Sequence, residues 1–170
     1  MKTFRLLFIL ILFSGCHNES SLPNIVLILA DDLGTDQVSS YWNAYYETPN
    51  IDRLSKEGML FQQAYTAAAR CSPTLAYIMT GKHPVRFRFT DYLVGSSPKD
   101  KPLLPPDNWQ KFLPLEEITI AEMLKKAGYE TALFGKWHLS KEKIPPKSIS
   151  HNPGKQGFDS SFVTYKPIRS

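Results

Sequence analysis

An unbroken aliphatic run at residues 24–30 is the feature that most constrains the fold of this chain. Its sequence, Asn-Ile-Val-Leu-Ile-Leu-Ala, shows no alternation with polar residues. Such a run is typical of a strand that is buried on both faces within a parallel sheet. It ends in Asp31-Asp32-Leu33-Gly34. Because ligands of open α/β sheets gather at the carboxyl ends of the strands, these two carboxylates are placed for chemistry.

Two helices are predicted in the following segment. Thr48 can cap a helix that begins at Pro49 and ends at Gly58. Residues 59–65 are expected to be extended. Pro73 marks a second helix that starts just after Cys71 and continues to Gly81, which places Cys71 at a helix N-terminus, where the macrodipole favours negative charge.

Local signals are weaker between residues 82 and 114, where prolines recur and long loops are expected. Thr119 and Glu122 then form a capping box, and the apolar residues that follow keep helical spacing up to Gly128. Residues 129–134 predict the next strand, which ends in Gly135-Lys136-Trp137-His138. The segment from residue 140 onward is expected to be weakly structured.

The alternation of strands and helices predicts an α/β fold with a mostly parallel, helix-flanked sheet. About three strands are visible, whereas sheets usually have about four to six. The sequence is therefore expected to be an incomplete, N-terminal portion of a larger domain.

The N-terminus has the pattern of an export signal. Lys2 and Arg5 precede an apolar run at residues 6–13 that is too short to span a bilayer. Phe13-Ser14-Gly15-Cys16 resembles a bacterial lipobox, which implies cleavage before Cys16 and attachment of lipid to its sulfur. We expect residues 1–15 to be a lipoprotein signal peptide, 16–23 a tether and 24–170 part of a catalytic domain. The protein would be exported and lipid-anchored at the bacterial cell envelope, on the periplasmic or outer-membrane face; a plain secretory signal is the alternative.

The chain has two cysteines. If Cys16 carries lipid, Cys71 has no intrachain disulfide partner, which is unusual for an exported protein. Chemical conversion of Cys71 would explain it, and a buried inert thiol is the alternative. The net charge of +4 is modest and the basic residues are scattered, so no nucleic-acid partner is expected.

Taken singly, the polar groups are weak signals: Asp31-Asp32 could be a solvated turn, Lys136 a surface cation and His138 a structural histidine. Their order gains meaning from Cys71-Ser72-Pro73-Thr74-Leu75. This stretch resembles the Cys-x-Pro-x-Arg modification signature of the formylglycine-dependent sulfatases, within the alkaline-phosphatase-like group. Residues 48–54, 80–84, 113–117 and 157–159 also resemble sulfatase segments, and the resemblance spans roughly residues 23–162.

The resemblance implies the roles of the candidate site residues. Asp31 and Asp32 would bind a metal, usually Ca²⁺ with Mg²⁺ as an alternative, and Cys71, converted to formylglycine, would add an oxygen ligand. Lys136 would hold a charged oxygen and His138 would accept a proton. A formylglycine-generating or radical enzyme would mature Cys71, and the substrate would be a sulfated glycan or an aryl sulfate.

Two departures from the family pattern leave other functions open. Leu75 stands where the signature has arginine, with Arg70 and Arg86 nearby in sequence. The resemblance also implies further metal ligands, which would lie beyond residue 170. Asp159 is available, but its Gly-Phe-Asp context indicates a structural role. The alternatives are therefore a truncated or degenerate, non-catalytic relative, and a phosphate or phosphonate ester hydrolase of the same superfamily.

Overall fold

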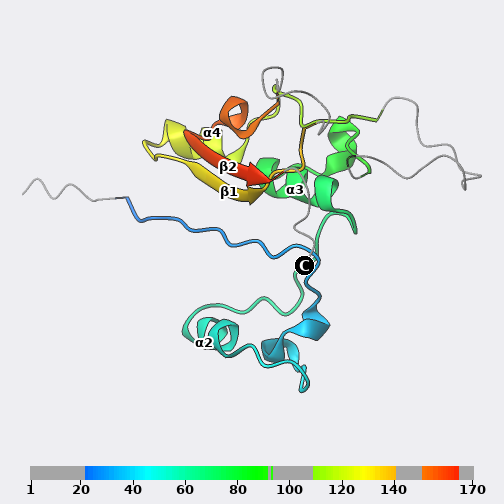
Figure 1. Ribbon diagram of the computed structural model, residues 1–170, viewed down its shortest axis with the longest axis vertical. Coiled ribbons are helices and arrows are strands. Elements are labelled where there is room, and N and C mark those ends of the chain that lie inside the picture. Colours follow the sequence, from blue (N-terminus) through cyan, green and yellow to red (C-terminus); the bar gives the residue numbers. More distant parts are fainter. Residues whose placement is uncertain (1–21, 92, 94–108, 141–150, 165–170) are drawn as a thin grey trace, which may run out of the picture.

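The computed structural model describes residues 22–91, 93, 109–140 and 151–164. The expected signal peptide and Cys16 lie outside these residues. The elements in chain order are η1 (Thr35–Gln37), η2 (Ser39–Tyr41), α2 (Pro49–Glu57), α3 (Cys71–Thr80), η3 (Pro84–Phe87), α4 (Ile120–Lys126), β1 (Ala132–Lys136), η6 (Pro153–Gln156) and β2 (Ser160–Thr164). Helices α3 and α4 lie with the two strands in one body, and α2 lies apart from it with the first two 3₁₀ turns (Figure 1).

The sheet confirms the predicted α/β class. Strands β1 and β2 pair in parallel, with Ala132 opposite Ser160 and Lys136 opposite Thr164. The first strand begins three residues later than the sequence predicts. The second strand was not predicted at all, because Ser160–Thr164 lies in a segment whose composition favoured irregular structure.

Helix α4 confirms the predicted capping box. The Thr119 hydroxyl accepts a hydrogen bond from the Glu122 amide at 3.2 Å, and the Thr119 amide donates to the Glu122 carboxylate at 2.7 Å. Thr119 is fully buried, and its hydroxyl also donates to the Gln156 carbonyl at 2.6 Å. The cap therefore fixes the start of α4 and joins it to η6.

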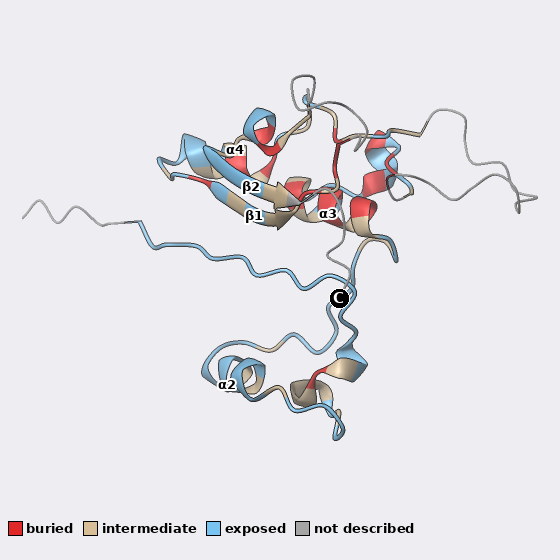
Figure 2. Cartoon of the chain, in the orientation of Figure 1, coloured by how far each residue is buried: buried red, intermediate tan, exposed pale blue. Residues whose placement is uncertain are grey.

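Helix α3 carries the main apolar contacts. It begins at Cys71 and is closed by Gly81 at φ 66°, a left-handed conformation that glycine adopts without steric cost. Leu75, Ala76 and Met79 on this helix belong to a buried cluster that also contains Trp137 and other apolar residues of the same body. Buried residues concentrate around α3 in Figure 2, whereas α2 is largely exposed.

Helix α2 has the predicted bounds, but its N-terminus is not capped as the sequence predicts. The Thr48 side chain does not cap it. Instead the Thr48 hydroxyl accepts from the Ser39 amide at 3.0 Å and donates to Asp52 at 3.1 Å, and the Ser39 hydroxyl donates to Asp52 at 2.7 Å. The side chain that should close the helix end is thus used to tie η2 to α2.

The prediction of a buried strand at residues 24–30 is wrong for this structure. The segment has no strand partner among the described residues, and Val26 and Ile28 are 81% and 84% exposed. A strand requires a neighbour that supplies ladder hydrogen bonds, and β1 forms its ladder with β2. The segment runs extended past β1 instead (Figure 1). Residues 59–65, also expected to be extended, contain a turn and no strand.

Candidate functional site

Three candidate residues converge at one place. One side-chain donor atom each from Asp31, Asp32 and Cys71 lies within 4.8 Å of the others. Asp32 adopts φ 58°, so the chain turns sharply as it leaves the extended segment. Both carboxylates are exposed and the thiol is partly buried. The carboxylates thus reach Cys71 even though residues 24–30 form no strand.

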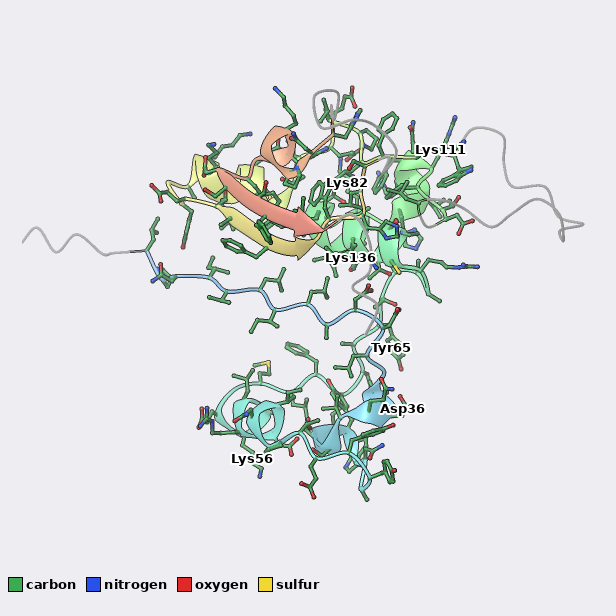
Figure 3. The ribbon with its side chains drawn as sticks, viewed as in Figure 1. Asp36, Lys56, Tyr65, Lys82, Lys111 and Lys136 are labelled. Carbon is green, nitrogen blue, oxygen red and sulfur yellow. The ribbon has the colours of Figure 1, made fainter. Side chains whose placement is uncertain are left out.

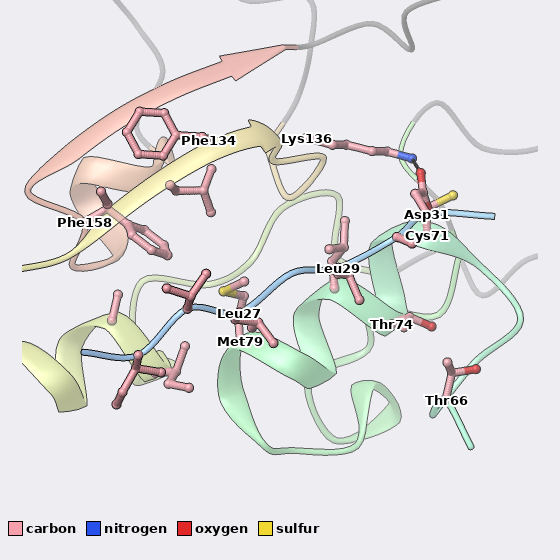
Figure 4. A pocket seen from close by; sticks show the side chains of 18 of the residues that line it. Leu27, Leu29, Asp31, Thr66, Cys71, Thr74, Met79, Phe134, Lys136 and Phe158 are labelled. Atoms are coloured by element: carbon pink, nitrogen blue, oxygen red, sulfur yellow. Dashed lines mark hydrogen bonds and ion pairs between the residues drawn. The ribbon is translucent and has the colours of Figure 1, made fainter. Parts of the chain in front are cut away.

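Lys136, the last residue of β1, joins this cluster through an ion pair between its Nζ and the Asp31 carboxylate (Figure 4). Burial alone would lower the pKa of Lys136. The hydrogen bond to Asp31 and the electrostatic influence of Cys71 act in the opposite direction, and the net effect is a raised pKa. The side chain therefore remains an ammonium group beside the carboxylate and the thiol.

All four residues line one open cleft. Its other walls come from the extended segment, from α3 and from β1, and Leu27, Leu29, Met79 and Phe134 supply apolar surface (Figure 4). The cleft thus has a charged end next to Cys71 and an apolar trough leading away from it. Lys136 lies in the body that holds the sheet, whereas Asp36 and Lys56 lie in the part around α2 (Figure 3).

The residues around Cys71 place it at the first turn of α3. Arg70 is the N-cap residue, with extended backbone, and its guanidinium pairs with Asp91 at 4.0 Å. Backbone amides of the first helical turn lack intrahelical acceptors, and the helix dipole adds positive potential there. Cys71 therefore lies where an anionic group is favoured.

Leu75, one helical turn after Cys71, faces both the core and the cleft. It is 7% exposed, packs in the buried apolar cluster and also lines the cleft. It brings no charge to the site. Arg86 lies on η3 and is not among the residues that line the cleft.

His138 is not brought into this cluster. It follows β1 with φ 47°, and its Nε2 lies 3.2 Å from the Leu93 carbonyl oxygen. It is absent from the lining of the cleft that contains Asp31 and Cys71.

Asp159 has the structural role that its sequence context indicates. Its carboxylate accepts hydrogen bonds from the Thr131 amide and hydroxyl, each at 3.0 Å, and pairs with Lys125. The hydrogen bond from Lys125, followed by those from Thr131, lowers the pKa of Asp159 to about 2. Asp159 thus fixes the turn into β2 and is not available to the cluster.

Sequence reasoning missed Ser72. Its side chain is fully buried, and its hydroxyl accepts a hydrogen bond from the Leu93 amide at 3.0 Å. A hydroxyl residue in the first turn of a helix was visible in the sequence. Its partner, 21 residues away, was not.

The donor set fits part of the shell of a hard divalent cation. Ca²⁺ takes 6–8 oxygen ligands and Mg²⁺ takes six. The two aspartates provide up to about four carboxylate oxygens, because each carboxylate has two. Asp31 shares its carboxylate with Lys136, so a cation bound there competes with the ammonium group.

Comparison with known proteins gives consistent matches. Residues 23–170 match the sulfatase family model. The chain is 36% identical over 172 residues to steryl-sulfatase of Homo sapiens, which covers 94% of this chain and 27% of that protein. It is 39% identical over 140 residues to N-acetylgalactosamine-6-sulfatase of Rattus norvegicus, covering 82% and 25%.

Solved structures also match most of this chain. One, from work on glycosaminoglycan metabolism by Bacteroides thetaiotaomicron, has a TM-score of 0.68 at 36% identity and covers 85% of this chain and 28% of that one. The crystal structure of Ps i-CgsB has a TM-score of 0.62 at 34% identity, covering 83% and 28%. The chain therefore spans about a quarter of the length of the relatives it matches.

Proposed function

This chain belongs to the sulfatase family, and on that premise we propose that it forms the nucleophile-bearing part of a sulfuric ester hydrolase. The reaction is R–O–SO₃⁻ + H₂O → R–OH + HSO₄⁻. The observation that carries the proposal is the cluster itself, in which Asp31, Asp32 and Cys71 lie together and Lys136 pairs with Asp31.

Conversion of Cys71 to formylglycine is the finer part of the proposal. A thiolate is a soft ligand, whereas two carboxylates select a hard cation that prefers oxygen. An oxygen-bearing side chain at residue 71 therefore fits the neighbouring donors better than sulfur does. The aldehyde hydrate would supply a hydroxyl nucleophile, and a formylglycine-generating or radical enzyme would carry out the oxidation.

Asp31 and Asp32 would hold the cation, Ca²⁺ or Mg²⁺. When bound, it would act as a Lewis acid on the sulfate ester. Lys136, kept protonated by its surroundings, would bind a sulfate oxygen as negative charge develops. The N-terminus of α3 would favour the same charge. His138 would accept a proton only after its ring comes closer to the cluster than it lies here.

Sulfated glycans or aryl sulfates are the proposed substrates. The matched relatives include a steryl-sulfatase and an N-acetylgalactosamine-6-sulfatase, and one solved neighbour is known in complex with k-i-k-neocarrahexaose. The apolar trough beside Cys71 offers a surface for a ring-shaped alcohol.

Lipid on Cys16 would anchor the protein at the bacterial cell envelope, and a Cys16→Ala variant should then appear in the soluble fraction.

The test combines mass spectrometry with paired substrates. The protein is isolated from a host that contains a maturation enzyme, and the peptide carrying residue 71 is analysed for an aldehyde. Hydrolysis of p-nitrophenyl sulfate and p-nitrophenyl phosphate is then measured with Cys71→Ala as the control. The proposal expects an aldehyde and a preference for sulfate. An unmodified thiol together with hydrolysis that Cys71→Ala retains would overturn it.

A further inference from the structure

We propose that Ser72 is a positioning residue that holds the His138 ring through the backbone of Leu93. The functional consequence rests on the proposed sulfatase activity, since it assumes that His138 takes part in proton transfer. The structural connection itself does not depend on that activity.

Two hydrogen-bonding contacts at Leu93 carry the inference. The Leu93 amide donates to the Ser72 hydroxyl at 3.0 Å, and the Leu93 carbonyl oxygen lies 3.2 Å from His138 Nε2. Ser72 is fully buried and Leu93 is 3% exposed, so water does not readily replace either contact. One residue of the loop thus connects the first turn of α3 with the segment after β1.

The chemistry of the carbonyl decides the form of the histidine. A carbonyl oxygen only accepts hydrogen bonds, so Nε2 must carry the proton when it makes this contact. The tautomer and the orientation of the imidazole ring are therefore set by where the Leu93 carbonyl lies. That position in turn depends on the acceptor that Ser72 offers to the Leu93 amide.

Ser72 also follows Cys71 directly. A shift at the start of α3 would move the Leu93 amide, and the carbonyl of the same residue would carry the shift to His138. The arrangement thus couples the position of the proposed nucleophile to the position of the proposed base. A hydroxyl that only filled space in the core would give no such coupling.

The experiment reads the histidine ring directly. Ring ¹⁵N chemical shifts of His138 are recorded by NMR on the 170-residue chain, together with hydrogen exchange of the Leu93 amide. In the unmutated chain we expect the Nε2–H tautomer and a protected amide. In Ser72→Ala we expect a mixture of tautomers and exchange of Leu93 that is faster by up to about tenfold, which corresponds to the loss of one hydrogen bond.

Ser140→Ala is the matched control. Ser140 is 2% exposed and lies two residues from His138, and its hydroxyl has no hydrogen-bond partner among the residues that the structure describes. Its removal should leave the tautomer unchanged, and Ser72→Thr, which keeps a hydroxyl, should restore the wild-type spectrum. An Nδ1–H tautomer in the unmutated chain would overturn the proposal without any variant. Equal responses in the two alanine variants would overturn it as well.

Failure of the proposed function is a separate result. If residue 71 stays a thiol and no sulfate ester is cleaved, the NMR result still stands or falls by itself. If the enzyme is active, Ser72→Ala should change kcat more than KM, because the Leu93 contact holds the His138 ring outside the cluster and its loss alters how the ring reaches the proton, not how the alcohol binds.

Discussion

Leu75→Arg is the substitution that most directly tests the link between fold and site. It restores the residue of the family signature but places a guanidinium where an apolar side chain now packs in the core. Burying a leucine side chain contributes about 1.5–3 kcal/mol, and truncation to alanine in a core costs about 2–5 kcal/mol. Leu75 is 7% exposed, so nearly all of the free energy of burying its side chain would be lost.

We expect Leu75→Arg to lower the free energy of unfolding by about 2–3 kcal/mol. The loss stays near the lower end of the core-truncation range because residue 75 also lines the cleft, so the guanidinium can turn toward the carboxylates of Asp31 and Asp32. The substitution should also raise the yield of aldehyde at Cys71, since it completes the maturation signature.

Urea denaturation followed by Trp137 fluorescence measures the stability, because Trp137 is 1% exposed and packs in the same cluster. Leu75→Met is the control and should cost less than about 1.5 kcal/mol. If Leu75→Arg proves as stable as the unmutated chain, Leu75 does not pack as described. If Leu75→Arg yields no aldehyde in a host that matures other sulfatases, arginine is not what the site lacks.

Three further predictions concern other parts of the chain. The pKa of Asp159 is lowered to about 2, so its contribution to stability should be complete above the unfolded pKa of about 4 and lost as pH falls through 2. When the melting temperature is measured at decreasing pH, Asp159→Asn should therefore show a smaller decrease than the unmutated chain. Thr119→Val should cost about 1–3 kcal/mol in urea denaturation, because it removes the α4 cap and leaves the buried Gln156 carbonyl without its donor, whereas Thr119→Ser should be nearly neutral. Ca²⁺ should raise the melting temperature of the unmutated chain. Asp31→Asn should abolish this rise, whereas Lys136→Met should enlarge it, because the competing ammonium group is gone. The absence of a response in the unmutated chain and in both variants would refute a cation site at this cluster.

Most signals that act within a few residues were reliable in the sequence, the exception being Thr48, whose side chain does not cap α2. Pro49, the Thr119–Glu122 pair and Gly81 each define a helix end through local backbone chemistry, and the bounds of α2, α3 and α4 follow from them. The strands were harder, because a strand is defined by its partner. Residues 24–30 have the composition of a buried strand but no ladder among the described residues, whereas β2 has an ordinary composition and a partner in β1.

The same distinction applies to the site. The family pattern pointed to Asp31, Asp32, Cys71, Lys136 and His138. The structure gathers the first four because the turn after the extended segment, the start of α3 and the end of β1 meet at one end of the cleft. His138 contacts the Leu93 carbonyl instead. The contact between Ser72 and Leu93 could not be foreseen, because it joins residues 21 positions apart through a backbone amide. Contacts of this kind carry no compositional signature.

Asp31 has two competing partners in the proposed reaction, Lys136 and the cation. Its carboxylate now neutralises Lys136, yet the proposed reaction requires the same carboxylate for a cation and the same ammonium group for a sulfate oxygen. Both requirements would be met together, because Asp31 would give up its ion pair with Lys136 when it holds a cation, and Lys136 would then be available to an anionic substrate. Binding of cation and substrate should therefore be mutually reinforcing, since each removes a competitor of the other. The ion pair would thus keep the exposed Asp31 carboxylate and the partly buried Lys136 ammonium group paired until both ligands arrive.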